Sequence, residues 1–408
     1  MSKRRFGEKL RSVLFWTHLT LGVSGGIIVL ILSLSGMLLG YERQMLAWID
    51  GTPLPGAVPG AVRMPLDSLL ARAAIDRADI ASIDIRTAAG TPVMVRFRER
   101  TRLPAILDPY TGASLPLPKL TKTRKAFTWI RTWHLFLAAP EGGRLRVYAQ
   151  AAMGVAMLAL VLTLPIGVYL WWPVTWNAAS LRATVLFRRG LSGRARDFNW
   201  HNVVGFWSAI PLFLVALTAV FLAYQWPTRW LDRALGSPAE KAAAIAAAAA
   251  RPVPSTVPAP SAEAAPKPPV RAAFVPNTGG ASPSLLFAAV AAMHPDWQLV
   301  VLNMPTASQP AVQVTVAEGN TFRPDLQASM ILDAVTAAPV TVRTWDSLSV
   351  SRKLRSWVRR THTGEAFGIG GQTIATLASA AGVLLALTGL TLALRRFSRW
   401  RASAVGQA

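Results

Sequence analysis

The sequence has no cysteine, and this absence excludes several classes of site at once. Disulfide frameworks, iron–sulfur clusters, Cys-ligated zinc and thiol nucleophiles all require cysteine, so none of them is expected. Charged residues are also scarce, at 15% of the 408 residues against roughly 25% in soluble domains. Asp and Glu number 20 against 43 Lys and Arg, and there are five histidines. What remains is a hydrophobic, basic chain with few side chains able to carry chemistry.

Four long stretches of the chain contain no Asp, Glu, Lys or Arg. They are residues 12–41, 147–181, 198–228 and 366–394. A helix needs about 20 mostly apolar residues to cross the ~30 Å hydrocarbon core of a bilayer, and each stretch supplies them. Since core helices of soluble proteins rarely run so long without charge, we predict four transmembrane helices. The first is expected to be an uncleaved anchor, because its apolar run is too long for a signal peptide.

The distribution of basic residues predicts the orientation of these helices. Lys and Arg are concentrated in the tail before the first helix, the loop between the second and third, and the tail after the fourth. Because the chain crosses the membrane four times, these three segments lie on the same side of it. The positive-inside rule predicts that this side is the cytoplasm. The long connections, roughly 42–146 and 227–365, then face outward. A net charge of +23 can indicate nucleic acid, but its distribution follows the membrane topology, so no nucleic-acid partner is expected.

Each outward connection repeats the same plan, a short helix followed by short strands. The expected elements are 68–73, 81–85, 92–97 and 105–108 in the first connection, and 284–289, 299–302, 311–316 and 330–333 in the second. The plan predicts two small α+β modules. The second is degenerate at its closing turn, where Ala337 and Ala338 stand in place of a glycine.

These patterns predict a four-transmembrane-helix bundle with two outward α+β modules. The Ala/Pro-rich composition between the third helix and the second module predicts a semi-rigid or disordered linker. The predicted parts are a cytoplasmic tail and first transmembrane helix (1–41), the first module (42–130), an outer histidine segment and second helix (131–181), a cytoplasmic loop and third helix (182–228), the linker (229–280), the second module (281–350), and the fourth helix with a cytoplasmic tail (351–408).

Four of the five histidines lie at ends of the predicted helices. His18 and His201 stand at the cytoplasmic starts of the first and third helices, whereas His134 and His362 stand on the outer side, just before the second and fourth. The topology therefore predicts two pairs at different depths, because about 20 helical residues separate the two levels by ~30 Å. The fifth, His294, lies in the second module and is expected to be exposed.

Two pairs of histidines at matched depths favour a functional role. A single one would be explained by bonding to water or lipid headgroups, but ionisable residues in spans are costly and usually mark function. Neutral imidazole is a common axial ligand of haem iron. Zinc is a weaker interpretation, since two histidines without cysteine leave a tetrahedral site short of ligands. The spans lack Asp and Glu, which argues against a proton relay. Their small residues fit a flat cofactor and helix packing equally well.

Several strings in the sequence resemble those of the PepSY-associated transmembrane proteins. They are Leu107 to Gly112, Trp133 to Leu135, Asn199 to Asn202, Thr361 to Gly368 and Thr388 to Leu390. The resemblance covers nearly the whole chain except the linker. The best-understood members of the family are inner-membrane ferric-siderophore reductases. The resemblance implies two PepSY-like modules in the periplasm and two b-type haems per chain, the inner haem held by His18 and His201 and the outer by His134 and His362.

The implied activity is electron transfer across the bacterial inner membrane, with both chain termini cytoplasmic. The partners would be a quinol or cytoplasmic reductase as electron donor and a periplasmic ferric siderophore that is reduced and releases Fe(II). Two alternatives stay open: a haem b conduit to a separate periplasmic enzyme, and a non-redox PepSY protein that binds or transports in the envelope.

Basic residues are also concentrated just before the outer histidines, five before His134 and five before His362. They are expected to hold haem propionates and to attract an anionic ferric chelate, Arg131 and Arg360 above all because they are nearest to the ligands. The alternative is a belt of solvated cations that faces the lipid headgroups.

Overall fold

The computed structural model describes residues 3–50, 61–88, 90–99, 102–116, 121–172, 177–242, 280–306 and 311–405. The chain divides into two compact units. The first comprises Met1–Ile49, Leu120–Trp230 and Arg355–Ala408, and the second comprises Asp50–Lys119 and Leu231–Leu354. Of the expected linker, residues 243–279 lie outside the described residues, as does Lys119 of the outer basic residues.

Four helices in the first unit are long and apolar enough to cross a membrane, as predicted. They are α1 (Lys3–Leu39), α5 (Arg144–Trp171), α7 (Gly193–Ala223) and α12 (Gly368–Val405). Pro165 lies inside α5 and Pro211 inside α7. Membrane helices tolerate such prolines because neighbouring helices and local adjustments satisfy the freed backbone groups.

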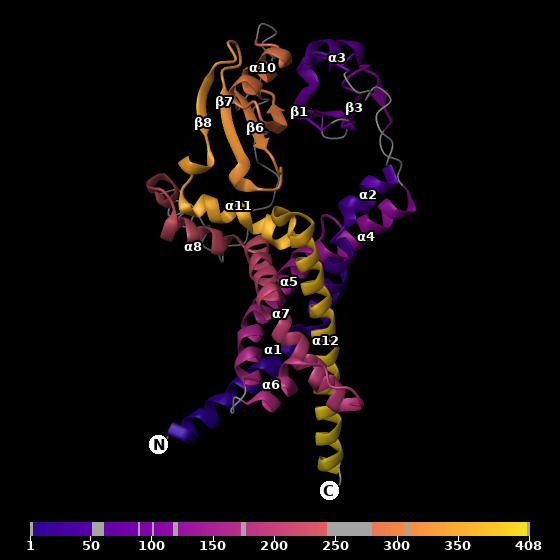
Figure 1. Cartoon of the computed structure of the whole chain (residues 1–408), viewed down its shortest axis with the longest axis vertical. Coiled ribbons are helices and arrows are strands. Elements are labelled where there is room, and N and C mark those ends of the chain that lie inside the picture. The colour runs from indigo at the N-terminus through magenta and orange to yellow at the C-terminus, as the bar shows by residue number, and fades with distance from the viewer. Residues whose placement is uncertain are drawn as a thin grey trace, which may run out of the picture. The chain divides into compact units, whose positions relative to one another are not determined.

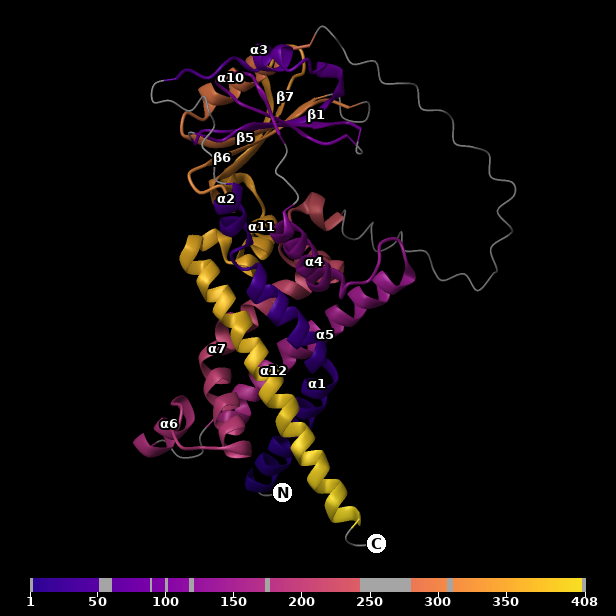
Figure 2. The same cartoon turned by 90° about the vertical axis from the view of Figure 1, so that its right-hand side faces the viewer.

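These four helices run alongside one another in a bundle (Figures 1 and 2). The main contacts of α1 are with α5 and α12, and those of α7 are with the same two helices. Thus α1 and α7 occupy opposite corners. Gly25 of α1 packs against Ala156 of α5, and Gly26 packs against Leu390 of α12. Small residues at these contacts let the helices approach closely. Close van der Waals packing is needed because the hydrophobic effect does not drive helices together within lipid.

Shorter helices flank the spans of the bundle. They are α2 (Glu42–Asp50), α4 (Lys122–Phe136), α6 (Ala178–Val185), α8 (Gln225–Leu235) and α11 (Val350–Thr363). Helix α4 starts where Thr121 caps the backbone N–H of Arg124, and it ends where Leu137 adopts the left-handed conformation, φ 49°. The chain can therefore leave α4 just after His134 and begin the separate span α5.

The second unit contains one antiparallel sheet of eight strands in the order β4-β3-β2-β1-β5-β6-β7-β8. The strands are β1 (Ile80–Arg86), β2 (Val93–Phe97), β3 (Ala105–Leu107), β4 (Ser114–Leu115), β5 (Trp297–Asn303), β6 (Val312–Glu318), β7 (Gln327–Leu332) and β8 (Pro339–Arg343). The repeated α+β plan is confirmed, and the strands of the two repeats form one continuous sheet. Strand β1 pairs with β5, from Ser82 opposite Asn303 to Arg86 opposite Leu299.

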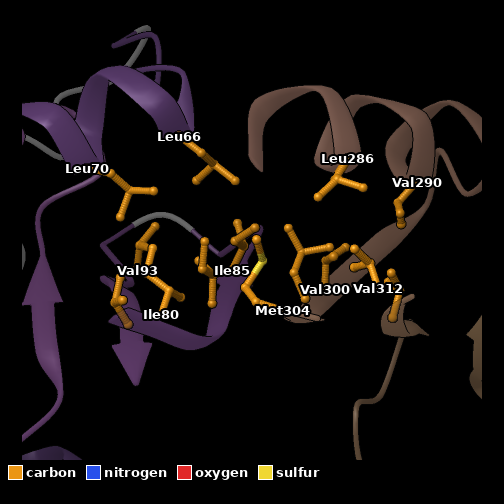
Figure 3. Packing of buried hydrophobic residues seen from close by; sticks show 14 of the residues in the cluster. Leu66, Leu70, Ile80, Ile85, Val93, Leu286, Val290, Val300, Met304 and Val312 are labelled. Carbon is orange, nitrogen blue, oxygen red and sulfur yellow. The ribbon is translucent and has the colours of Figure 1, made fainter. Parts of the chain in front are cut away.

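One face of this sheet is covered by α3 (Leu66–Arg72) and α10 (Pro283–Met293), one helix from each repeat. Figure 3 shows Leu66 and Leu70 of α3 and Leu286 and Val290 of α10 directed at the strands. Alternate strand residues complete this core because side chains alternate between the faces of a strand. Burying both helices on a shared sheet gives the two small modules one larger hydrophobic core.

The closing turns of the two repeats have the same hydrogen bonding. The Asp108 carboxylate accepts bonds from the backbone N–H groups of the two residues after Pro109, and Asp333 does the same in the second repeat. Gly112 has φ +71°, and Ala337 adopts φ +60° at the equivalent place. The second turn thus keeps its shape with alanine at a position that favours glycine, although its sequence no longer matches the first turn.

Glu240, just after α8, binds residues at the start of α11, and its contribution to stability should depend on pH. It accepts hydrogen bonds from Ser349 Oγ (2.6 Å) and the Ser237 backbone N–H (2.7 Å), and it pairs with Arg352. Burial alone would raise the pKa of this carboxyl, but the hydrogen bonds outweigh it and lower the pKa of Glu240 to about 2. The ionised Glu240 carboxylate therefore stabilises the fold fully at pH values above 4.5, the ordinary pKa of a glutamate. This contribution is lost as the pH falls towards 2.

We therefore expect Glu240→Gln to lower the melting temperature of the full chain in detergent at pH 7. The difference from the wild type should shrink as pH falls from about 4.5 towards 2. Glu141→Gln is the matched control, because the Glu141 side chain is 94% exposed and pairs only loosely with Arg146, at 3.6 Å. An equal loss of stability at pH 7 and near pH 2 would show that Glu240 does not act through its charge.

Candidate functional site

The inner pair consists of His18 on α1 and His201 on α7. Their ring centroids lie 6.3 Å apart and the ring planes meet at 89°. Because α1 and α7 occupy opposite corners of the bundle, the two imidazoles approach each other across its interior. The structure thus brings together two residues that are far apart in the sequence and were expected at one depth.

The outer pair consists of His134 on α4 and His362 on α11. Their ring centroids also lie 6.3 Å apart, with the ring planes at 46°. Burial lowers the pKa of His134 to about 4, and the neighbouring imidazole of His362 adds to the effect. Burial likewise lowers the pKa of His362. Both rings are therefore neutral at pH 7, the form in which imidazole binds a metal.

The two pairs lie at different depths of the same bundle. Helix α1 carries His18 and also reaches His134, through Ser35. At about 1.5 Å of rise per residue, His18 and Ser35 are about 26 Å apart along the helix axis. Helix α7 repeats the arrangement, since it carries His201 and contacts His362 through Val215. Direct contact between the pairs is therefore excluded.

Every one of these four histidines has a hydrogen-bond partner at Nδ1, supplied by a neighbouring helix. The partners are the Thr163 carbonyl for His18 (3.0 Å), Thr388 Oγ1 for His201 (2.9 Å), Ser35 Oγ for His134 (3.0 Å), and the Val215 carbonyl (3.1 Å) with Thr218 Oγ1 (3.2 Å) for His362. Metal-ligating histidines almost always bond their second nitrogen in this way, which fixes the ring orientation. Nε2 is then the nitrogen left for a ligand.

Glycines make room for three of the rings. A Cβ on Gly167, Gly389 or Gly36 would stand 3.1, 3.2 or 3.2 Å from Cε1 of His18, His201 or His134, respectively. These distances are tighter than ordinary van der Waals contact, so each imidazole lies directly on the backbone of a neighbouring helix. Some of the small residues in the membrane helices are thus explained by close packing of the histidine rings against them.

The ring spacing fits two imidazoles that bind one metal from opposite sides. A metal–nitrogen bond is about 2.0 Å and a ring nitrogen lies about 1.1 Å from its centroid, so two such rings have centroids about 6.2 Å apart, close to the observed 6.3 Å. Both pairs have this spacing. In the described residues there is no group of three or more His, Cys, Asp or Glu that could hold a metal ion. The donor set therefore fits a metal whose other ligands come from a macrocycle, and it does not fit tetrahedral zinc.

A cavity of about 1160 Å³ surrounds the inner pair. It extends from His18 and His201 to a group of arginines, and among the described residues that line it Glu8 alone is acidic. These arginines are Arg11, Arg188, Arg194, Arg396 and Arg399. Ligand pockets commonly measure roughly 300–1,000 Å³, so there is space for a large planar molecule with an anionic edge at the arginines.

The two outer arginines expected to hold a cofactor have carboxylate neighbours. Arg131 Nη2 lies 2.5 Å from Glu42 Oε2, and its side chain is 54% exposed. Arg360 is half-buried and lies within electrostatic range of Glu365, which is paired with Arg43 at 2.8 Å. Ion pairs thus tie α4 to α2 and α2 to the start of the fourth span, beside the outer pair.

Sequence reasoning missed the partners of the histidines. Backbone carbonyls such as that of Thr163 leave no trace in a sequence, whereas the Ser35-Gly36 and Thr388-Gly389 dipeptides were visible without an assigned role. The expected exposure of His294 is wrong. Its side chain is 15% exposed and its Nδ1 lies 2.7 Å from Glu318 Oε1, in the sheet unit.

Comparison with known proteins supplies the family. The sequence matches the PepSY-associated TM region family over residues 15–396, which is nearly its whole length. The chain therefore belongs to this family. No curated protein matches it.

Proposed function

We propose that this PepSY-associated membrane protein is an oxidoreductase that carries electrons through two b-type haems to a ferric siderophore. One haem would be held by His18 and His201 and the other by His134 and His362. The observation that supports this most strongly is the repeated 6.3 Å spacing of two imidazole pairs, each ring with its Nδ1 already bonded. Bound haem would supply the one-electron chemistry, and the protein would supply the histidine ligands, their position and their burial.

The residues of the chain have separate tasks in this function. The histidines would present Nε2 to the iron, and the glycines that pack against three of them would allow close approach. At the inner site, the cavity arginines Arg11, Arg188 and Arg194 would bind the propionates, because guanidinium pairs well with carboxylate. At the outer site, Arg131 and Arg360 are the nearest cations proposed for this role. The apolar helices between the sites exclude water.

The membrane and its sidedness belong to the same proposal. The concentration of Lys and Arg in the two tails and the loop between α5 and α7 favours the cytoplasm for these segments. The protein would then lie in a bacterial inner membrane with the sheet unit in the periplasm. Electrons would come from a quinol or a cytoplasmic reductase, through the inner pair first.

The proposed substrate follows from the chemistry of iron release. Adding one electron to Fe(III) gives Fe(II), whose lower charge weakens its attraction to the hard oxygen ligands of a siderophore. The chelate then releases the iron. Basic side chains on α4 and α11 raise the local concentration of anionic chelates near the outer pair.

The experiment mixes dithionite-reduced protein with ferric siderophores and follows the haem Soret band. We expect reoxidation by at least one ferric chelate, with Fe(II) trapped by a chromogenic ligand. The gallium(III) complex of the same siderophore is the matched control, because it binds alike and cannot be reduced. A haem-containing protein that no ferric chelate reoxidises would favour the conduit to a partner enzyme, and a haem-free protein would favour the non-redox alternative.

A further inference from the structure

Three of the four histidines have a side-chain hydroxyl at Nδ1, and in two of these cases the hydroxyl residue is followed by glycine. Ser35 of α1 serves His134, and Thr388 of α12 serves His201. The glycine that follows each of them packs against the Nδ1–Cε1 edge of the same ring. One dipeptide thus supplies both a hydrogen-bond partner and the room for the imidazole to reach it.

The direction of the hydrogen bond at Thr388 follows from its other contact. Thr388 Oγ1 lies 2.6 Å from the carbonyl oxygen of Leu384, one turn back on α12. A carbonyl can only accept, and a hydroxyl has a single hydrogen, so this hydrogen goes to Leu384. Towards His201 the hydroxyl oxygen can only accept. The hydrogen between them must therefore be on His201 Nδ1.

Ser35 gives the same result on a different helix. Its Oγ lies 2.7 Å from the carbonyl oxygen of Ile31, one turn back on α1. Its hydrogen is used there, so His134 must donate through Nδ1. In a neutral imidazole with Nδ1–H, the lone pair is on Nε2.

The remaining two histidines reach the same tautomer by a simpler route. The Nδ1 atoms of His18 and His362 each face a backbone carbonyl, of Thr163 and Val215, and a carbonyl forces them to donate. Each pair therefore contains one ring whose Nδ1 meets a backbone carbonyl and one ring whose Nδ1 meets the hydroxyl of a Ser-Gly or Thr-Gly dipeptide, and His362 contacts the Thr218 hydroxyl in addition to its carbonyl. The carbonyls cannot be removed by a side-chain substitution, whereas the two hydroxyls can.

We propose that Ser35 and Thr388 are positioning residues, which hold His134 and His201 in the Nδ1–H tautomer so that the Nε2 lone pair faces the metal. This inference rests on the proposed function, in which Nε2 binds haem iron. Partners of this kind orient the ligand and raise its basicity, and their loss typically costs about 10–100-fold in metal affinity. A more basic axial ligand favours the ferric state, so losing the acceptor should raise the midpoint potential of the haem concerned.

The first test measures the tautomers without haem. The full-length chain, labelled with ¹⁵N-histidine and purified in detergent from cells unable to make haem, is studied by NMR. We expect Nδ1–H signals and unprotonated Nε2 signals from His18, His134, His201 and His362. The Nε2–H tautomer at His134 or His201 in the wild-type protein would overturn the proposal, whatever the haem content of the protein turns out to be.

The second test uses variants in the haem-loaded protein. Thr388→Ala should lower haem affinity at the inner site by about 10–100-fold and raise the inner midpoint potential, leaving the outer haem unchanged. Ser35→Ala should have the corresponding effect at the outer site alone. Thr388→Ser and Ser35→Thr restore the acceptor and should restore both quantities. Thr391→Ala is the matched control, because Thr391 is a half-buried residue of the same helix whose hydroxyl donates to the Leu387 carbonyl in the same way.

The outcomes separate this proposal from the function on which it rests. If the wild-type protein never binds haem but shows four Nδ1–H tautomers, the proposed function fails and the assignment of the hydroxyls stands. If haem binds, and Thr388→Ala and Ser35→Ala change neither tautomer nor potential, or change them no more than Thr391→Ala does, the positioning role is wrong.

Discussion

Replacing His201 with alanine is expected to remove one of the two haems and to leave the other bound. The variant deletes one of the two histidines proposed to hold the inner haem. It leaves only His18, whose ring centroid lies 6.3 Å from that of His201 in the wild type. The outer pair lies about 20 Å or more away along α7, so its ligands and their hydrogen bonds are unaffected. His134→Ala should do the reverse, because His134 belongs only to the outer pair.

The measurement is the haem content per chain together with a redox titration. The wild type should titrate with two components, and each variant should retain one, a different one in each case. His294→Ala is the matched control, since this histidine is bonded to Glu318 in the sheet unit and should leave both components intact. Loss of both haems in either variant, or of neither, would contradict the pairing of His18 with His201 and of His134 with His362.

Gly389→Val is expected to abolish haem binding at the inner site without removing any ligand. A Cβ at this position already stands 3.2 Å from Cε1 of His201, and valine adds two methyl groups to the same space. The imidazole would have to rotate or shift away from α12, and it would then lose the bond to Thr388. A ring displaced from this position would no longer present Nε2 towards His18, so the predicted loss of inner haem is nearly complete.

Gly370→Val on the same helix is the control for this prediction. A Cβ at Gly370 meets no atom within 4 Å, so the variant carries the same substitution in α12 without touching a ring. Its haem content should equal that of the wild type. Equal loss of haem in both variants would mean that valine acts on the helix itself, and full retention in Gly389→Val would mean that the ring does not need the glycine.

The sequence was sufficient for the membrane helices and for the depth of the histidines. Helices that cross a bilayer must satisfy their backbone internally and present apolar side chains, so charge-free stretches mark them reliably. Four spans then place each helix end on one side or the other. The number of spans alone therefore predicts that His18 and His201 lie at the same depth in the membrane, without knowledge of any contact between helices.

What the sequence could not supply depended on contacts between distant segments. The pairing of β1 with β5 joins the two repeats into one sheet, and nothing local to either strand specifies that partner. The carbonyl of Thr163 acts through the backbone, which is the same for every residue type. The large basic cavity at the inner pair combines arginines from three separate segments that had been explained by topology alone.

In the second closing turn, by contrast, the conformation is kept although the sequence motif is lost. Alanine replaces glycine at position 337, which weakens the sequence match, yet the turn keeps a positive φ and its carboxylate contacts. A left-handed alanine costs roughly 1–2 kcal/mol, which a turn with several hydrogen bonds and a shared core can absorb. The motif is therefore lost in sequence and retained in conformation.

If the two histidine pairs are two haem sites, the purified protein must contain two haems per chain, and counting them is the most direct test. The full-length protein, expressed with haem supplied and purified in detergent, is assayed by pyridine haemochrome against amino-acid analysis, and its iron coordination is read by electron paramagnetic resonance. We expect two b-type haems per chain, both low-spin with two imidazole ligands. A protein that is colourless under these conditions, or whose haem iron lacks bis-imidazole coordination, would contradict it.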